Sequence, residues 1–160
     1  MPEAQKGDPA PTADDDRGFM DMAIEQALLG RSEGGLPIGS VIVMDGDVIG
    51  RGRNLRVQRS SPILHAEMSA LEDAGRRSSS EYRRCTLYTT LSPCPMCSGA
   101  VLLYGIPRVV IGDSTTYKGS TSTLTDAGVE VVDMRCDECA AMMRRLIDSA
   151  PELWYEDIGV

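Results

Sequence analysis

The sequence predicts an α/β domain in which helices cover both faces of a β-sheet. Along its 160 residues, short β-branched runs alternate with segments whose apolar residues recur every three or four positions. Strands and helices that alternate at this spacing are typical of a sheet with a helical layer on each side. The length is that of one ordinary domain, and such a chain can bury roughly two-thirds of its unfolded surface. We therefore expect one domain with its own core.

Residues 1–17 are expected to form a disordered acidic tail, which leaves residues 18–160 for the folded domain. The segment contains three prolines and few apolar side chains, a composition that cannot bury a core. Its five acidic and two basic residues give a net charge of −3, so the folded part retains −5 of the formal −8.

In the first half of the chain the pattern predicts two helices and a hairpin. The first helix spans 18–30, where apolar residues recur at helical spacing. Two strands at 40–44 and 48–50 flank Asp45-Gly46, a dipeptide that suits the positive φ angles of a hairpin turn. The second helix is expected over 61–75, because a serine cap followed by proline opens it and glycine closes it.

In the second half, strands and helices alternate again. β-Branched runs mark the strands, and a serine–proline pair opens the first of the helices. The expected elements are a strand at 86–90, a helix at 92–105, strands at 109–111 and 129–132, a helix at 138–149 and a short helix after residue 151.

The only histidine and two of the five cysteines form a metal-binding pattern. His65 lies in the sequence HAE, and Cys94 and Cys97 follow in PCPMC, 29 residues later. Cysteines three apart in the first turn of a helix share one face, and the free N–H groups there favour thiolate. Together with one histidine they give three ligands, which leaves the fourth position of a tetrahedral zinc site open. An open position is typical of a catalytic site, and H-x-E…P-C-x-x-C is the pattern of zinc deaminases.

Glu67, two residues after the histidine, distinguishes between two kinds of site. As a fourth ligand it would close the site, whereas beside an open site it can accept the proton of a water activated by zinc. The alternatives are a structural zinc knot with a surface glutamate, or a core histidine beside an unrelated pair of cysteines. We interpret Glu67 as the catalytic residue.

From about Gly18 onward the whole chain resembles fungal-type cytosine deaminase, a member of the cytidine deaminase superfamily. The segments that carry the resemblance are EGGLPIGS, RGRNLR, LHAEMS, TLYTTLSPCPMC, YGIPR and LWYEDIG. The metal motif is common to the superfamily, while the last segment is similar to the element that closes a free-base pocket. The resemblance implies a three-layer α/β/α sandwich around a mixed five-stranded sheet. It also implies one Zn²⁺ per chain, a cytoplasmic homodimer, and hydrolysis of cytosine to uracil and ammonia in pyrimidine salvage.

The resemblance also implies a role for each site residue. His65, Cys94 and Cys97 would bind zinc, and Glu67 would shuttle protons. The base would be held by side chains and by backbone groups. Asn54 would face the ring amide edge, Asp157 the exocyclic amine, Trp154 and Tyr117 the ring faces, and the backbone of Ile38, Ala66, Ser92 and Cys94 would complete the polar contacts.

Two departures from the family leave the substrate open. The family has glycine where this chain has Ala66, and phenylalanine where it has Tyr117. A hydroxyl in a dry pocket needs a partner, so another base or a small amidine is an alternative to cytosine. Further alternatives are a guanine or other amino-heterocycle deaminase, a tRNA adenosine deaminase, and a zinc-binding interaction domain without activity.

Charge and hydropathy argue against nucleic-acid and membrane partners. An acidic chain gains little from the counterion release that drives binding to nucleic acid. There is no apolar run of about 18 residues and no basic-then-apolar segment at the N-terminus, so we expect a cytosolic protein. Cys85, Cys136 and Cys139 are expected to be buried bystander thiols. The arginine clusters at 51–59 and 76–84 are expected in solvated loops or intersubunit salt bridges.

Overall fold

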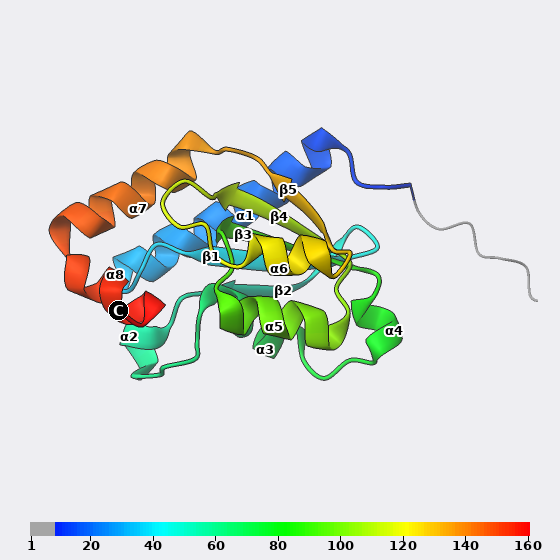
Figure 1. Ribbon diagram of the computed structural model, residues 1–160, viewed down its shortest axis with the longest axis horizontal. Helices are drawn as coiled ribbons and strands as arrows, with labels where there is room; N and C mark the ends of the chain where they lie inside the picture. The colour runs from blue at the N-terminus through cyan, green and yellow to red at the C-terminus, as the bar shows by residue number, and fades with distance from the viewer. Residues whose placement is uncertain (1–8) are drawn as a thin grey trace, which may run out of the picture.

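A computed structural model describes residues 9–160, and it contains one mixed five-stranded sheet (Figure 1). The strand order is β2-β1-β3-β4-β5, so β3 is central. β1 runs antiparallel to β2 and β3, whereas β3, β4 and β5 are parallel. The strands span Gly39–Met44 (β1), Asp47–Arg53 (β2), Cys85–Leu91 (β3), Arg108–Asp113 (β4) and Glu130–Asp133 (β5). The predicted mixed sheet is therefore confirmed, with β1 to β4 longer than their apolar runs and β5 shifted by one residue.

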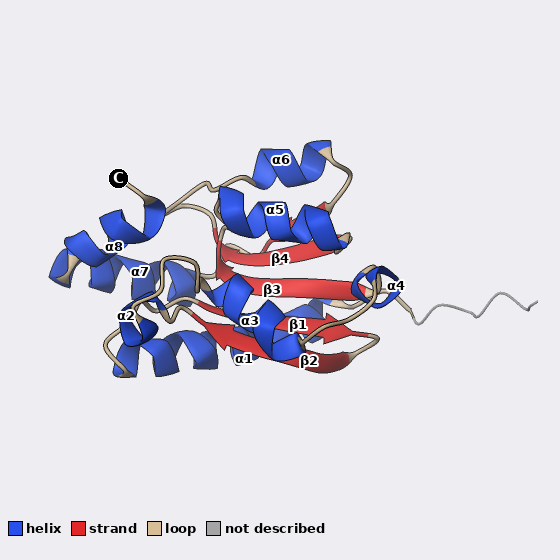
Figure 2. Cartoon of the chain, turned by 90° about the horizontal axis from the view of Figure 1, so that it is seen from below, coloured by secondary structure: helices blue, strands red, loops and turns tan. Residues whose placement is uncertain are grey.

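Helices cover both faces of this sheet, which confirms the predicted sandwich (Figures 1 and 2). One face carries α1 (Ala13–Ser32) and α7 (Asp137–Ser149), and the other carries α3 (Ala66–Ala74), α5 (Pro95–Tyr104) and α6 (Thr121–Asp126). The short helices are α2 (Arg56–Arg59), α4 (Ser79–Tyr82) and α8 (Pro151–Ile158). Within residues 9–160, no helix is both long and apolar enough to cross a membrane.

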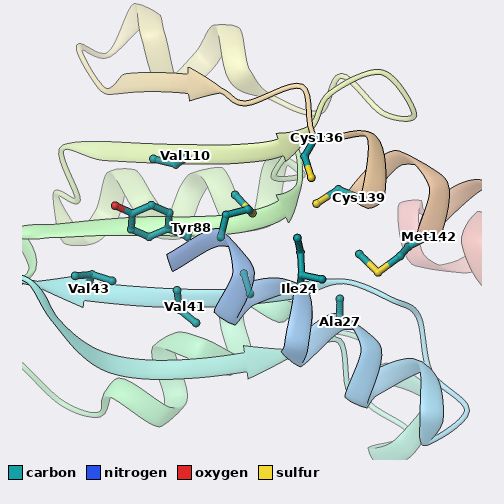
Figure 3. Close-up of a cluster of buried hydrophobic side chains, with 11 residues drawn as sticks. Ile24, Ala27, Val41, Val43, Tyr88, Val110, Cys136, Cys139 and Met142 are labelled. Carbon is teal, nitrogen blue, oxygen red and sulfur yellow. The ribbon is translucent and has the colours of Figure 1, made fainter. Parts of the chain in front are cut away.

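The core between α1, α7 and the sheet is built from alternate residues of the central strands (Figure 3). Side chains of Val41, Tyr88 and Val110 point from three neighbouring strands toward the two helices. Cys136 caps α7 and Cys139 lies in its first turn, and both thiols are buried in this core. All five cysteines lie in the described residues and are free, as expected of a chain without disulfides.

The predicted tail boundary at residue 17 is wrong, because α1 begins at Ala13. Thr12 caps the helix in a reciprocal capping box with Asp15. The run of three aspartates occupies the first turn, where the helix dipole favours carboxylates. Asp16 is buried and accepts two hydrogen bonds from Arg108 at 2.7–2.8 Å and one from the Tyr88 hydroxyl at 2.7 Å. The part of the predicted tail at residues 1–8 lies outside the described residues.

The predicted start of the second helix at residue 61 is also wrong. The Ser61 hydroxyl accepts the N–H of Ile63 at 3.3 Å, so the serine–proline pair forms a turn instead of a cap. The helix begins five residues later at Ala66, with His65 as its N-cap. In the same way α5 begins at Pro95, beyond the predicted serine–proline pair. Both shifts place a candidate metal ligand at a helix N-terminus.

Two glycines on β2 let α3 lie directly against the sheet. A Cβ at Gly50 or Gly52 would collide with the backbone of Ala70 on α3. The absence of side chains at these two positions therefore allows the close approach of helix and strand, which fixes α3 and the residues at its N-terminus.

Replacement of Asp16 by asparagine is predicted to lower the free energy of unfolding by about 3 kcal/mol, because the largely buried Arg108 guanidinium loses its buried carboxylate partner and keeps only the exposed Glu130. Urea titration at pH 7 measures this change. The matched control is Asp21→Asn on the same helix, which breaks an exposed ion pair with Arg17 and should change stability by less than about 1 kcal/mol. Equal effects of the two substitutions would contradict this account.

The contribution of Asp16 also has a predicted pH dependence. Burial raises the pKa of Asp16, but the hydrogen bonds from Arg108 and Tyr88 outweigh it and lower the pKa below its usual value. A lowered folded-state pKa means that the stabilisation is present above about pH 4 and is lost as the pH falls through the folded-state pKa.

Candidate active site

Two helix N-termini meet at the carboxyl ends of β3 and β4, the edge where α/β sheets commonly bind ligands. His65 caps α3 and Cys94 caps α5, while Cys97 lies in the first turn of α5. The helices α2 and α8 lie at the same end of the sheet (Figures 1 and 2). One ligand atom from each of His65, Cys94 and Cys97 lies within 4.8 Å of the others. The structure thus brings together the three predicted metal ligands.

The donor set of this cluster fits a zinc ion. Zinc is bound by cysteine thiolates and histidine nitrogens, and three protein ligands are typical of catalytic zinc sites. His65 Nδ1 lies 3.4 Å from Cys94 Sγ, which also accepts the N–H of Cys97 at 3.4 Å. The geometry therefore assigns Nδ1 to the metal cluster and leaves Nε2 for a second partner.

Without metal the cluster holds an internal ion pair. The neighbouring Cys97 thiol, followed by the hydrogen bond from His65, lowers the pKa of Cys94 to about 4 despite its burial. Burial would lower the pKa of His65, but the hydrogen bond with Cys94 and the charges of Asp157 and Glu67 raise it to about 9. The pKa of Cys97 rises well above its usual value, because its thiol lies beside Cys94 and is buried. At neutral pH, Cys94 is a thiolate, while His65 and Cys97 retain their protons.

Glu67 lies in the first turn of α3 with its carboxylate buried beside the cluster. Oε1 accepts the Thr89 hydroxyl at 3.0 Å and Oε2 accepts the Cys97 thiol at 3.4 Å. Burial raises the pKa of Glu67, and the charge of His65 offsets this only in part. A carboxyl group with a raised pKa can both accept and return a proton near neutral pH, as a general acid–base residue must.

A small pocket opens over the cluster and collects most of the predicted substrate contacts. It encloses about 280 Å³ of empty space when the opening to solvent is included. The predicted residues in its lining are Ile38, Asn54, His65, Ala66, Glu67, Ser92, Cys94, Tyr117, Trp154 and Asp157. Leu91 and Ile158 also line it and were not predicted, although each adjoins a residue that was. Residues that lie far apart in the sequence, between positions 38 and 158, thus line one pocket.

Asn54 and Asp157 form the polar end of the pocket. The amide of Asn54 donates to Asp157 Oδ1 at 2.7 Å, and its own oxygen accepts the N–H of Arg56 at 3.1 Å, which fixes the orientation of the amide. Asp157 Oδ1 lies 3.5 Å from His65 Nε2, so this carboxylate also orients the histidine. Burial raises the pKa of Asp157, although His65 and Asn54 oppose the shift. Arg56, expected in a solvated loop, is instead largely buried beside Asp157.

Two aromatic side chains form the wall of the pocket. Trp154 on α8 and Tyr117 from the loop after β4 meet edge to face, with ring centroids 5.6 Å apart and planes at 83°. The Asp113 carboxylate at the end of β4 holds that loop, since it accepts hydrogen bonds from Thr115 and Thr116. Burial raises the pKa of the Tyr117 hydroxyl.

Zinc binding at pH 7 is predicted to release about two protons per chain. His65 must become neutral and Cys97 must become a thiolate, whereas Cys94 is already deprotonated. Zinc affinity should therefore rise steeply with pH up to about pH 9, the raised pKa of His65, and less steeply above it, where only Cys97 still loses a proton on binding. Calorimetric titration in buffers of different ionisation enthalpy counts the protons. The Cys97→Ser variant should release about one proton fewer than the unmodified chain. A release of about three protons by the unmodified chain would contradict the assignment of Cys94 as a thiolate.

Comparison with known proteins agrees with this geometry. The family described as "cytidine and deoxycytidylate deaminase zinc-binding region" matches residues 13–113. A cytosine deaminase from Candida albicans is 50% identical over 146 residues, which cover 91% of this chain and 97% of that protein. A tRNA-specific adenosine deaminase from Streptococcus pyogenes is 40% identical over 107 residues, which cover 66% of this chain and 67% of that protein.

A solved structure shows the same fold. The guanine deaminase from Bacillus subtilis superposes with a TM-score of 0.55 at 32% identity, over 71% of this chain and 70% of that protein. The family match includes the histidine, the glutamate and both cysteines of the cluster. The chain therefore belongs to the zinc-binding cytidine and deoxycytidylate deaminase family and is a zinc-dependent hydrolytic deaminase.

Proposed function

We propose that this chain deaminates a free pyrimidine base, cytosine, to uracil and ammonia with the consumption of one water. The observation that carries the proposal is the small pocket beside the metal cluster, which is lined by Glu67 and by Trp154 and Asp157 from α8. This pocket offers a small ring two polar partners, Asn54 and Asp157. The high identity to a cytosine deaminase over nearly the whole length of both chains supports the same substrate.

The proposed roles follow from the positions of the side chains. Asn54 holds the ring amide edge, and Asp157 accepts a hydrogen bond from the exocyclic amine. Trp154 and Tyr117 cover the ring and exclude bulk water. These four residues thus fix the amine-bearing carbon near Glu67.

Proton transfer is assigned to Glu67. When bound by His65, Cys94 and Cys97, zinc supplies the Lewis acid that makes water a nucleophile near neutral pH. Glu67 accepts one proton of the attacking water and delivers it to the ring nitrogen. It then takes the second proton from the new hydroxyl on the ring carbon and passes it to the amine, which leaves as ammonia while the hydroxyl oxygen becomes the carbonyl of uracil. Its position in the first turn of α3, between the metal cluster and the pocket, suits both transfers.

Two alternative substrates have specific support. Relatives described as tRNA-specific adenosine deaminases are similar to this chain, but a polymer substrate favours a basic approach surface and an open pocket, whereas this chain carries a net charge of −8 and residues of α8 line its pocket. Guanine or another amino-heterocycle is favoured by the Tyr117 hydroxyl and the Ala66 methyl, which both line the pocket.

The substrate is tested by ammonia release from cytosine, 5-methylcytosine, cytidine, guanine, adenine and an aminotriazine. Cytosine is expected to be the preferred substrate, and cytidine is expected to be inert because its ribose has no room beneath α8. Faster turnover of guanine or adenine than of cytosine would mean that the substrate is a purine base. Full zinc content without ammonia from any compound would favour a zinc-binding interaction domain.

Glu67→Ala is predicted to retain zinc and to lose about 10²–10⁴-fold in kcat, because the zinc ligands remain but the proton carrier is gone. His65→Ala should lose zinc and activity together. Ammonia release and metal content of the purified variants separate the two outcomes. Glu25→Ala, which removes an exposed carboxylate on α1, serves as the control. Ammonia release by Glu67→Ala at the normal rate would overturn the assignment of Glu67.

We also propose a homodimer formed through the exposed side of α5. Leu102, Leu103 and Tyr104 end this helix with exposed side chains, and Ile63 adds to the same apolar surface. Exposed apolar patches of this kind mark interaction sites, and a second copy of the chain is the partner that the family resemblance implies. Leu103→Glu should convert the dimer to a folded monomer in sedimentation experiments, since Leu103 is 75% exposed in the single chain. An unchanged mass would place the interface elsewhere.

The proposed compartment is the cytoplasm and the proposed pathway is pyrimidine salvage. Five free cysteines, two of them in the metal cluster, suit a reducing environment. Conversion of a free base to uracil is the reaction that such a pathway requires.

A further inference from the structure

The central strand carries a hydroxyl directly behind Glu67 that has no part in the roles proposed above. Thr89 lies near the middle of the sheet and is fully buried. Because side chains alternate along a strand, Leu87 and Leu91 share its face, and both belong to apolar clusters. A hydroxyl in such a row needs a hydrogen-bond partner.

The partner of this hydroxyl is the proposed proton carrier. Thr89 Oγ1 lies 3.0 Å from Glu67 Oε1 and 3.2 Å from the carbonyl oxygen of Leu91. A hydroxyl has one hydrogen, and donation to a carboxylate gives the stronger bond. The β-branched side chain has a stiff χ1 angle, and the central strand holds its backbone, so the donor is rigid.

Metal binding makes this contact more important. The second side-chain donor to Glu67 is the thiol of Cys97, which contacts Oε2 at 3.4 Å. Zinc takes cysteine as thiolate, so this hydrogen is lost when the site is loaded. Among the side chains in the described part of the chain, Thr89 is then the remaining donor to Glu67.

The neighbouring strand adds a second hydroxyl at the same place. Ser40 on β1 is paired with Thr89 in the strand register, and its Oγ is buried without a hydrogen-bond partner. Cross-strand partners share one face of a sheet. The sheet therefore presents two hydroxyls beneath Glu67 within an otherwise apolar layer.

We propose that Thr89 is a positioning residue for Glu67, whose hydroxyl fixes Oε1 so that Oε2 faces the metal cluster and the pocket. The proposal rests on the role of Glu67 as proton carrier. Thr89 lies behind Glu67 and does not line the pocket, so its loss should impair proton transfer and leave substrate binding intact.

The test compares Thr89→Val, which removes the hydroxyl at constant shape, with Thr89→Ser, which retains it. With cytosine as substrate, Thr89→Val should lower kcat about 10- to 100-fold, the effect of losing one hydrogen bond to a charged group. Its KM should stay within about threefold, and Thr89→Ser should keep kcat within about threefold of the unmodified chain. Thr86→Val, the same substitution at the other end of β3, is the matched control and should leave kcat unchanged.

Two further readouts do not depend on turnover. Zinc content should equal that of the unmodified chain in every variant, and crystal structures should show a displaced Glu67 carboxylate in Thr89→Val and a native one in Thr89→Ser. If Thr89→Val does not fold, Thr89→Ala repeats the test with a smaller side chain.

Several outcomes would overturn the proposal. These are a native kcat in a variant without the hydroxyl, an equal loss of kcat in Thr89→Ser, and an undisplaced Glu67 in the Thr89→Val structure. Failure of the unmodified chain to release ammonia from cytosine would instead overturn the proposed substrate, and the position of Glu67 would still decide the role of Thr89.

Discussion

The site depends on one constraint, which is that two helices must begin next to each other at the same end of the sheet. His65 caps α3 and Cys94 caps α5, and ligand atoms at these two ends lie close enough to share one ion. The glycines of β2 let α3 approach the sheet, and β3 leads directly into the segment that carries Cys94. Free N–H groups at a helix start also favour the thiolate that zinc requires. The fold thus sets both the position and the charge of the ligands.

Around this constraint, Asn54, Asp157 and Glu67 each have a hydrogen-bond partner that limits their orientation. Asp157 holds Asn54 and faces the second nitrogen of His65, so one carboxylate joins the substrate pocket to the metal cluster. Thr89 likewise holds the carboxylate of Glu67 by a hydrogen bond from inside the sheet. Buried polar groups are expensive unless paired, and networks of this kind fix one arrangement of side chains. The same contacts that stabilise the fold therefore orient the reacting groups.

The sequence predicted the metal cluster better than it predicted the boundaries of the helices. The H-x-E…P-C-x-x-C pattern of zinc deaminases, together with the suitability of these side chains as zinc ligands, singled out His65, Cys94 and Cys97. The start of α1 was misplaced because Asp16 is buried by Arg108, which lies 92 residues away. Thr89 could not be recognised, since threonine is an ordinary residue in a strand and only the fold places it behind Glu67. Long-range contacts account for what sequence reasoning missed.

The central claim is that one zinc ion is held by one histidine nitrogen and two cysteine sulfurs, with a position left for water. X-ray absorption at the zinc K-edge of the loaded protein measures this directly. We expect two sulfur neighbours at about 2.3 Å and two nitrogen or oxygen neighbours at about 2.0–2.1 Å. A shell of three or four sulfurs, or one without sulfur, would contradict it.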